Sequence, residues 1–164
     1  MKIGSILENQ NIEKRIAVTP ELVKKYISLG FKILIEKNYG VHLGFSNETY
    51  QKEGCEIEDK NSVIEKSDII LQVNLPEDSI FSLIKEKKLL IGVFNSHQNN
   101  EKLIALAKNN INIFSLELLP RITRAQSMDI LSSQANLAGY KAVIDSFAIF
   151  QKAVPMMMTA AGTI

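Results

Sequence analysis

The sequence has little of several features that would point to particular classes of protein. Its 164 residues include one cysteine, which excludes an intrachain disulfide framework and fits a reducing compartment. The sequence has 19 Lys and Arg and 18 Asp and Glu, a formal net charge of +1. This balance gives no indication of a basic surface that would bind nucleic acid or an anionic membrane. The chain lacks the ~18 consecutive apolar residues that a membrane span needs, and its N-terminal apolar run is too short for a signal peptide. With 46% hydrophobic residues, one ordinary globular domain with its own core is indicated.

Metal ligands and reactive side chains are also scarce. The two histidines, His42 and His97, do not lie at the spacing of metal ligands, so we expect no metal site. Cys55 is followed by three acidic residues within 56–59. These neighbours raise a thiol pKa, so we expect no reactive thiolate there.

Short segments rich in Ile, Leu and Val alternate with helix-like segments along the chain. The helix predicted at 19–30 has Thr19 as a cap, Pro20 in its first turn and Gly30 at its end. Strands are predicted at 2–7, 32–36, 67–73, 88–94 and 111–117, a further helix at 100–108, and a glycine-bearing loop with a short helix between 38 and 54. This alternation predicts an α/β fold, a doubly wound and mostly parallel sheet with helices on both faces.

Ligands of such sheets bind at the carboxyl ends of the strands. We therefore expect the functional residues in the loops that follow Leu7, Val73, Phe94 and Glu117.

The segment from Arg121 to Val143 carries an unusual density of hydrogen-bonding side chains. Read as a helix from Gln126, it has one polar face and one apolar face at the same 3,4 spacing. The polar face comprises Gln126, Asp129, Ser133, Asn136 and Tyr140, and the apolar face Met128, Leu131, Ala135, Ala138 and Ala142. Because the polar face avoids Lys and Glu, it suits a ligand with amide and hydroxyl groups better than bulk water.

Structural roles explain the same residues equally well. Thr123 and Gln126 have the spacing of a capping box, and Asp129 in a first turn complements the helix dipole. Ser132 and Ser133 bond back to the preceding turn in many helices. Spacing alone therefore leaves both the ligand-facing and the structural interpretation open.

Three stretches resemble one known family. "LLPRITRAQSMDILSSQANLAGYKAVIDS" is similar to the hallmark segment of the proton-translocating nicotinamide nucleotide transhydrogenases, in the N-terminal, NAD(H)-binding part of their alpha subunit. "EKRIAVTPELVKKYISLGF" resembles a signature that this family shares with alanine dehydrogenase, and the terminal "TAAGT" also follows the pattern. The resemblance implies that residues 1–150 form the first domain of a two-domain nucleotide-binding unit. Residues 151–164 would then connect to a Rossmann NAD-binding domain that this chain does not contain, since it has no GxGxxG.

The resemblance also implies roles for four residues. Arg121, Gln126 and Asp129 match a mobile loop of the family that lies over the nicotinamide of NAD(H) and serves the catalytic step. Arg121 would bind the carboxamide while paired with Asp129, Ser132 would reach the carboxamide as well, and Gln126 would reach towards the second nucleotide. The implied activity is hydride transfer between NAD(H) and NADP(H), a step that depends on positioning more than on acid or base catalysis.

Partners and location follow from the same resemblance. NADP(H) would be bound by a partner subunit or domain, and membrane-spanning components would couple hydride transfer to proton movement. The chain would form a homodimer and lie on the cytoplasmic face of the bacterial inner membrane through its partners.

Two other functions are compatible with parts of the sequence. In an alanine dehydrogenase, Arg15 would hold a substrate carboxylate, but the lysine and histidine of that family's pattern are replaced here by Asn74 and Asn95, and His97 is two places out of register. Arg15 is equally suited to pair with Glu13 or Glu21. The third possibility is a non-catalytic docking domain.

Overall fold

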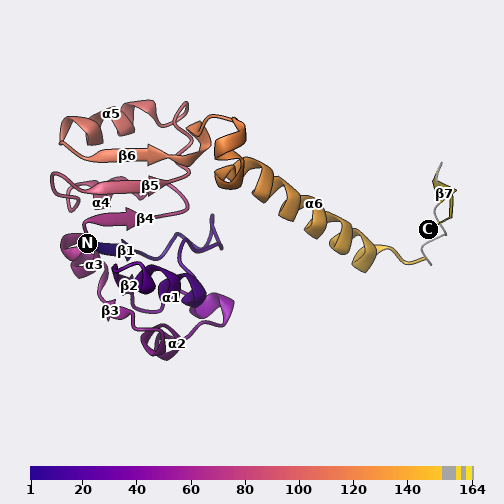
Figure 1. Cartoon of the computed structure of the whole chain (residues 1–164), viewed down its shortest axis with the longest axis horizontal. Coiled ribbons are helices and arrows are strands. Elements are labelled where there is room, and N and C mark those ends of the chain that lie inside the picture. Colours follow the sequence, from indigo (N-terminus) through magenta and orange to yellow (C-terminus); the bar gives the residue numbers. More distant parts are fainter. Residues whose placement is uncertain (153–157, 160–161, 164) are drawn as a thin grey trace. The chain divides into compact units, whose positions relative to one another are not determined.

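The chain folds around a parallel β-sheet. The computed structural model describes residues 1–152, 158–159 and 162–163, the last four by their backbone. Six strands pair in parallel in the order β3-β2-β1-β4-β5-β6, stacked from bottom to top in Figure 1. They are β1 (Lys2–Ser5), β2 (Lys32–Glu36), β3 (Glu56–Glu58), β4 (Ile69–Leu71), β5 (Leu89–Gly92) and β6 (Asn112–Ser115). The winding reverses between β1 and β4, which confirms the predicted doubly wound fold and marks the point where such sheets bind ligands.

Helices cover the sheet on two faces. Residues 1–120 contain the helices α1 (Pro20–Ser28), α2 (Asn47–Lys52), α3 (Lys60–Lys66), α4 (Asp78–Phe81) and α5 (Asn100–Lys108). They also contain the 3-10 helices η1 (Val41–Leu43) and η2 (Leu116–Leu118). Val23 of α1 packs in one core cluster with Ile3 and Ile33 of the sheet. Val63 of α3 packs in a second cluster with Leu90 and with residues of α4 and α5. Alternate residues of the strands thus pack into two hydrophobic cores, one on each face, as expected for a sheet buried on both sides.

The residues predicted to begin and end α1 do so in the structure. Pro20 occupies the first turn, where its missing N–H is no loss. Thr19 is the N-cap residue, although its side chain makes no capping hydrogen bond. Gly30 has a φ of +88°, a left-handed conformation that ends the helix and that glycine adopts without a Cβ clash.

Between residues 1 and 120, one strand and two α-helices were missed from the sequence. β3 has three residues and places Ile57 between two glutamates, so its apolar signal is too short to recognise. Helix α3 has seven residues and α4 four, less than the length at which helical periodicity becomes visible.

The chain divides into two compact units, Met1–Pro120 and Arg121–Ile164. We call the first the sheet unit and the second the α6 unit. The division falls inside the range 1–150 that was expected to form one domain, and the expected boundary to a further domain stays a prediction. The α6 unit contains η3 (Thr123–Met128), α6 (Ile130–Ile149) and the antiparallel two-residue strands β7 (Met158–Thr159) and β8 (Gly162–Thr163). Much of the predicted connector 151–164 lies outside the described residues.

The helix predicted from Gln126 to Val143 begins later and ends later than expected. Residues 123–128 form a 3-10 helix and α6 starts at Ile130, so Gln126 and Met128 do not continue its faces. Within the α6 unit as described, all residues from 131 to 149 are exposed, and the packing of an apolar face of this helix stays a prediction. Leu131 and Leu137 are each 59% exposed.

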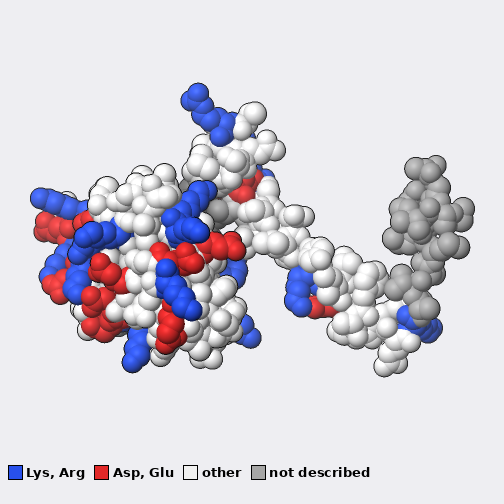
Figure 2. Space-filling view, turned by 60° about the horizontal axis from the view of Figure 1, so that its bottom comes forward, with Lys and Arg blue, Asp and Glu red and all other residues white. Residues whose placement is uncertain are grey.

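Charge is distributed differently over the two units. Figure 2 shows blue and red side chains interspersed over the sheet unit and a mainly white α6, whose charged residues are Lys141 and Asp145. No helix in the described part of the chain combines the length and apolar character of a membrane span.

Candidate functional site

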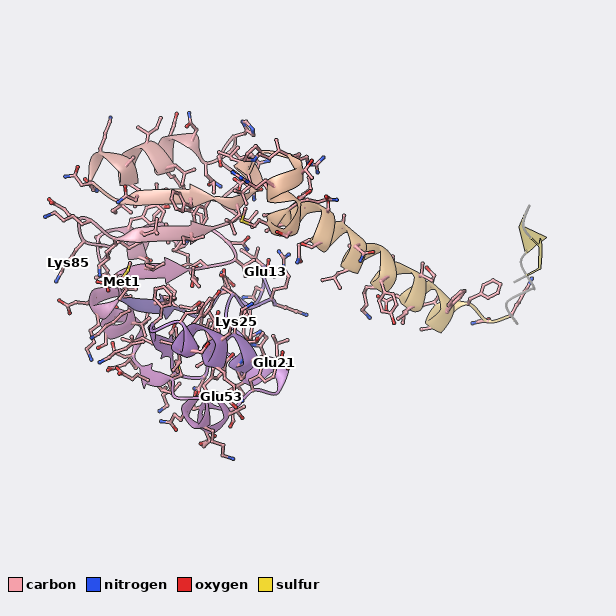
Figure 3. The ribbon with its side chains drawn as sticks, viewed as in Figure 1. Met1, Glu13, Glu21, Lys25, Glu53 and Lys85 are labelled. Atoms are coloured by element: carbon pink, nitrogen blue, oxygen red, sulfur yellow. The ribbon has the colours of Figure 1, made fainter. Side chains whose placement is uncertain are left out.

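The carboxyl ends of the strands border a pocket in the sheet unit. Figure 3 shows Glu13 on the side towards which the strand arrows point, with Met1 on the opposite side. The pocket has a volume of about 730 Å³. Its polar lining includes Glu8, Asn9, Glu13, Lys60, Gln72, Asn74, Glu77, Asp78, Asn95, Asn99 and Lys102. It therefore lies among the loops in which the sequence predicts functional residues.

Carboxylates from neighbouring segments hold two of these loops. Glu36, the last residue of β2, accepts a hydrogen bond from the Leu7 backbone N–H at 2.7 Å. Glu8 Oε1 accepts from the backbone N–H groups of Val73 at 2.6 Å and Asn74 at 3.4 Å. Burial raises the pKa of the Glu8 carboxyl, and the two backbone hydrogen bonds oppose that rise. The backbone at the pocket is thus fixed by side chains that belong to other segments.

A third carboxylate, Glu117 of η2, holds the loop after β5. It accepts hydrogen bonds from the Phe94 N–H at 3.2 Å, the Ser96 N–H at 2.8 Å and Ser96 Oγ at 2.5 Å. Burial opposes the charge, but the bonds from Ser96 and Phe94 outweigh it, so the pKa of the Glu117 carboxyl is lowered. Asn95, between the two donors, has a φ of +48°, which is uncommon outside glycine and favoured by asparagine.

Arg15 is committed to Glu13. It donates from its backbone N–H and from Nε to Glu13 Oε1, at 2.8 and 2.9 Å, and from an Nη to Oε2 at 2.6 Å. The Arg15 hydrogen bond lowers the pKa of the Glu13 carboxyl. Of the two carboxylates that the sequence offered as partners of Arg15, the structure brings it together with Glu13.

The charge of the pocket does not suit a 2-oxoacid. Four carboxylates and two lysine ammonium groups line it, so negative charge is in excess. Asn74 and Asn95 stand at the positions where the alanine dehydrogenase pattern has its lysine and histidine, and both contribute to the lining. A neutral ligand that donates hydrogen bonds fits these acceptors better than a carboxylate does.

Three of the four predicted residues of the α6 unit meet at the start of α6. Asp129 is the N-cap: its Oδ1 accepts from the Leu131 and Ser132 N–H groups at 3.0 and 3.1 Å. Its Oδ2 accepts from Ser132 Oγ at 2.7 Å and lies 3.9 Å from Arg121 Nε. The pKa of the Asp129 carboxyl is lowered, first by the Ser132 hydroxyl and then by its backbone N–H. Arg121, Asp129 and Ser132 thus form one group.

Gln126 stands apart from this group. It is exposed in η3, and its side chain makes no hydrogen bond within the described residues. The capping box that Thr123 and Gln126 offered does not form, because Asp129 caps α6 and η3 has Ile122 at its N-cap without a side-chain bond. The capping-box explanation of Gln126 therefore fails. Asp129 is the N-cap of α6 rather than a residue of its first turn. The expected back-bond is made by Ser133, whose Oγ donates to the Ile130 carbonyl at 3.1 Å, whereas Ser132 Oγ donates to the Asp129 side chain.

The sequence did not reveal the carboxylates that fix the loops. Glu36 and Glu117 are each the last residue of a predicted strand, and that position was the available signal. The explanation for Cys55 also needs a correction. Its pKa is raised to about 12 mainly by burial, with Glu56 a smaller cause.

The topology and the ligand edge of the sheet define a doubly wound α/β domain. The family described as "Alanine dehydrogenase/PNT, N-terminal domain" matches residues 5–138, and the chain belongs to this family. It is 40% identical to the first of the parts that make up NAD(P) transhydrogenase subunit alpha of Rickettsia prowazekii, over all of this chain and 44% of that protein. The crystal structure of transhydrogenase from Sinorhizobium meliloti superimposes with a TM-score of 0.88 at 40% identity, over all of this chain and 49% of that one.

Alanine dehydrogenases are more distant relatives. "Alanine dehydrogenase 1" of Staphylococcus aureus is 28% identical over 88% of this chain and 38% of that protein. The sequence spans less than half the length of these relatives.

Proposed function

We propose that this chain is the N-terminal part of the NAD(H)-binding component of a proton-translocating transhydrogenase. The observation that carries the proposal is the Arg121–Asp129–Ser132 group at the start of α6, within a segment that resembles the transhydrogenase hallmark. The 40% identity to a transhydrogenase alpha-subunit component supports it.

The residues present suit a nicotinamide carboxamide, which has one acceptor oxygen and one donor NH₂. The Arg121 side chain is 64% exposed and has guanidinium donors for the oxygen. Asp129 restrains that guanidinium by charge, and the lone pairs of Ser132 Oγ can accept from the NH₂. Gln126, uncommitted in the described structure, is the residue we assign to aligning the second nucleotide.

Nicotinamide cofactors supply the hydride chemistry themselves, so the chain contributes orientation and exclusion of water. In this proposal NADP(H) binds a partner subunit or domain, and membrane-spanning components carry the proton. The chain acts as a homodimer at the cytoplasmic face of the bacterial inner membrane, where its partners hold it.

The test is a comparison of two reactions in the protein extended to the length of its relatives and assembled with its partners. We expect reduction of an NADP analogue by NADH, and no alanine from pyruvate, ammonium and NADH. Arg15 is already paired with Glu13, and Asn74 and Asn95 cannot replace lysine and histidine as acids or bases. Alanine formation without transhydrogenation would contradict the proposal in favour of alanine dehydrogenase. Absence of both reactions would favour the docking domain.

A further inference from the structure

We propose that Asn95 is an additional NAD(H)-binding residue and that Glu117 is its positioning residue. The inference rests on the proposed function for the identity of the ligand. Its basis in the structure is a loop at the carboxyl edge that is held on both sides of Asn95.

The loop presents Asn95 in an otherwise unfavourable conformation. Asn95 has a left-handed φ of +48°, is exposed and contributes to the wall of the pocket. Its carbonyl accepts from the Gln98 and Asn99 N–H groups at 2.8 and 3.0 Å. Its side-chain amide makes no hydrogen bond within the described residues. The backbone of Asn95 is therefore held at the pocket, and its side-chain amide is available to a ligand.

Glu117 maintains this arrangement from outside the loop. Its three accepted bonds come from Phe94 and Ser96, the residues on either side of Asn95. A further bond from Asn99 Nδ2 to the Phe94 carbonyl, at 2.8 Å, closes the loop. Without the carboxylate, three donors at the pocket lose their acceptor, while the two hydrophobic clusters of the sheet unit keep their contacts.

An amide that both donates and accepts suits the polar part of NAD(H) that does the same, the carboxamide or the ribose hydroxyls. If the loop samples other conformations, the apparent dissociation constant rises as the competent fraction falls. Loss of Glu117 should therefore weaken cofactor binding and leave turnover at saturating cofactor nearly unchanged.

Asn95→Gly removes the amide and keeps the left-handed backbone, because glycine adopts positive φ without strain. Asn110→Gly is the matched control, since Asn110 has a φ of +56° in the turn before β6, at the opposite edge of the sheet. Calorimetry with NADH on the assembled, full-length protein should show a dissociation constant raised about tenfold by Asn95→Gly and unchanged by Asn110→Gly. Neither variant should lower the melting temperature. An unchanged constant for Asn95→Gly, or an equal rise for Asn110→Gly, would overturn the role of Asn95.

Glu117→Gln tests the positioning role. We expect faster hydrogen exchange at the Phe94 and Ser96 amides and a KM for NADH raised about tenfold, with kcat changed less than twofold. Glu101→Gln, an exposed carboxylate in the first turn of α5, should change neither quantity. Unchanged exchange at the two amides would refute the positioning role of Glu117. Faster exchange with an unchanged KM for NADH would show that Glu117 contributes to the structure of the loop alone. If the protein does not transhydrogenate at all, the proposed function fails, while NADH calorimetry and exchange still decide the roles of Asn95 and Glu117.

Discussion

Tyr39 shows how much of the sheet unit can depend on one hydroxyl. It is 1% exposed, and its oxygen accepts from the Ala17 and Val18 N–H groups at 2.9 and 3.2 Å. Ser5 Oγ lies 2.7 Å away. Burial raises the pKa of Tyr39 to about 12, so the phenol stays neutral across the physiological range. The approach to α1 and the end of β1 are thus joined through a single oxygen.

Tyr39→Phe should destabilise the protein by about 2–4 kcal/mol, because the buried Val18 N–H and the neighbouring Ala17 N–H lose their acceptor. Urea unfolding followed by circular dichroism measures this loss. Tyr26→Phe is the control: Tyr26 lies partly exposed on α1 and should lose less than about 0.5 kcal/mol. Equal stability of the two variants would show that water replaces the Tyr39 hydroxyl.

Gln126→Ala separates function from structure. The side chain is exposed and makes no bond within the described residues, so the melting temperature should stay within about 1 °C. If Gln126 aligns the two nucleotides, turnover in the assembled transhydrogenase should fall about a hundredfold, equivalent to about 2.7 kcal/mol. Gln51→Ala, at an exposed position of helix α2, should leave both quantities unchanged. Full turnover in Gln126→Ala would remove Gln126 from the site.

At the scale of elements, the start of α6 depends on the charge of Asp129. Because its folded pKa is lowered, the stabilisation is fully present above the unfolded value of about 3.9. It is lost as the pH falls through the folded pKa. The relevant window is therefore acidic, below pH 4.

Asp129→Ala should increase hydrogen exchange at the Leu131 and Ser132 amides several-fold at neutral pH, because both lose their cap. When the wild-type carboxyl is protonated, its protection should approach that of the variant. Asp129→Asn provides the control, since asparagine caps helices about as well and does not titrate in this range. Protection in the wild type that is independent of pH would show that the charge contributes nothing to the cap.

Prediction from sequence succeeded where an element has enough apolar residues to show its period. Strand β2 was predicted at 32–36 and is found at Lys32–Glu36, whereas β3, with Ile57 alone between glutamates, gave no alternation. The η3–α6 boundary was missed for a different reason. A 3-10 turn and an α-helix share polar residues at three-residue spacing, and the Asp129 cap between them depends on a backbone conformation that spacing does not encode.

The site was predictable to a similar, limited degree. The position of the loops followed from strand order and the rule for parallel sheets, and the group formed by Arg121, Asp129 and Ser132 followed from a resemblance. The hydrogen bond that Glu117 accepts from the Ser96 N–H spans 21 residues, and the one that Glu8 accepts from the Val73 N–H spans 65. Such pairings depend on which strands become neighbours, which no local pattern reports.

For the whole molecule, the 164 residues should bind NADH poorly by themselves. The sequence contains no glycine-rich fingerprint, so it lacks the backbone approach to the pyrophosphate on which dinucleotide binding relies. Calorimetry on residues 1–164, folded as judged by circular dichroism, should give a dissociation constant weaker than about 1 μM, or −8 kcal/mol. A tighter constant would mean that the sheet and α6 units hold most of the cofactor contacts.

The carboxylates at the pocket also bear on how such a protein can evolve. Glu8 holds the backbone at residue 74, and Glu117 holds the backbone on both sides of residue 95. The backbone conformation of these loops therefore depends on Glu8 and Glu117, and the side chains at 74 and 95 can change independently of it. Mutations at 74 or 95 change the group that a loop presents while Glu8 and Glu117 still hold its backbone, provided that the residue at 95 tolerates a positive φ. Descendants of one scaffold can therefore diverge in chemistry while these loops keep their course.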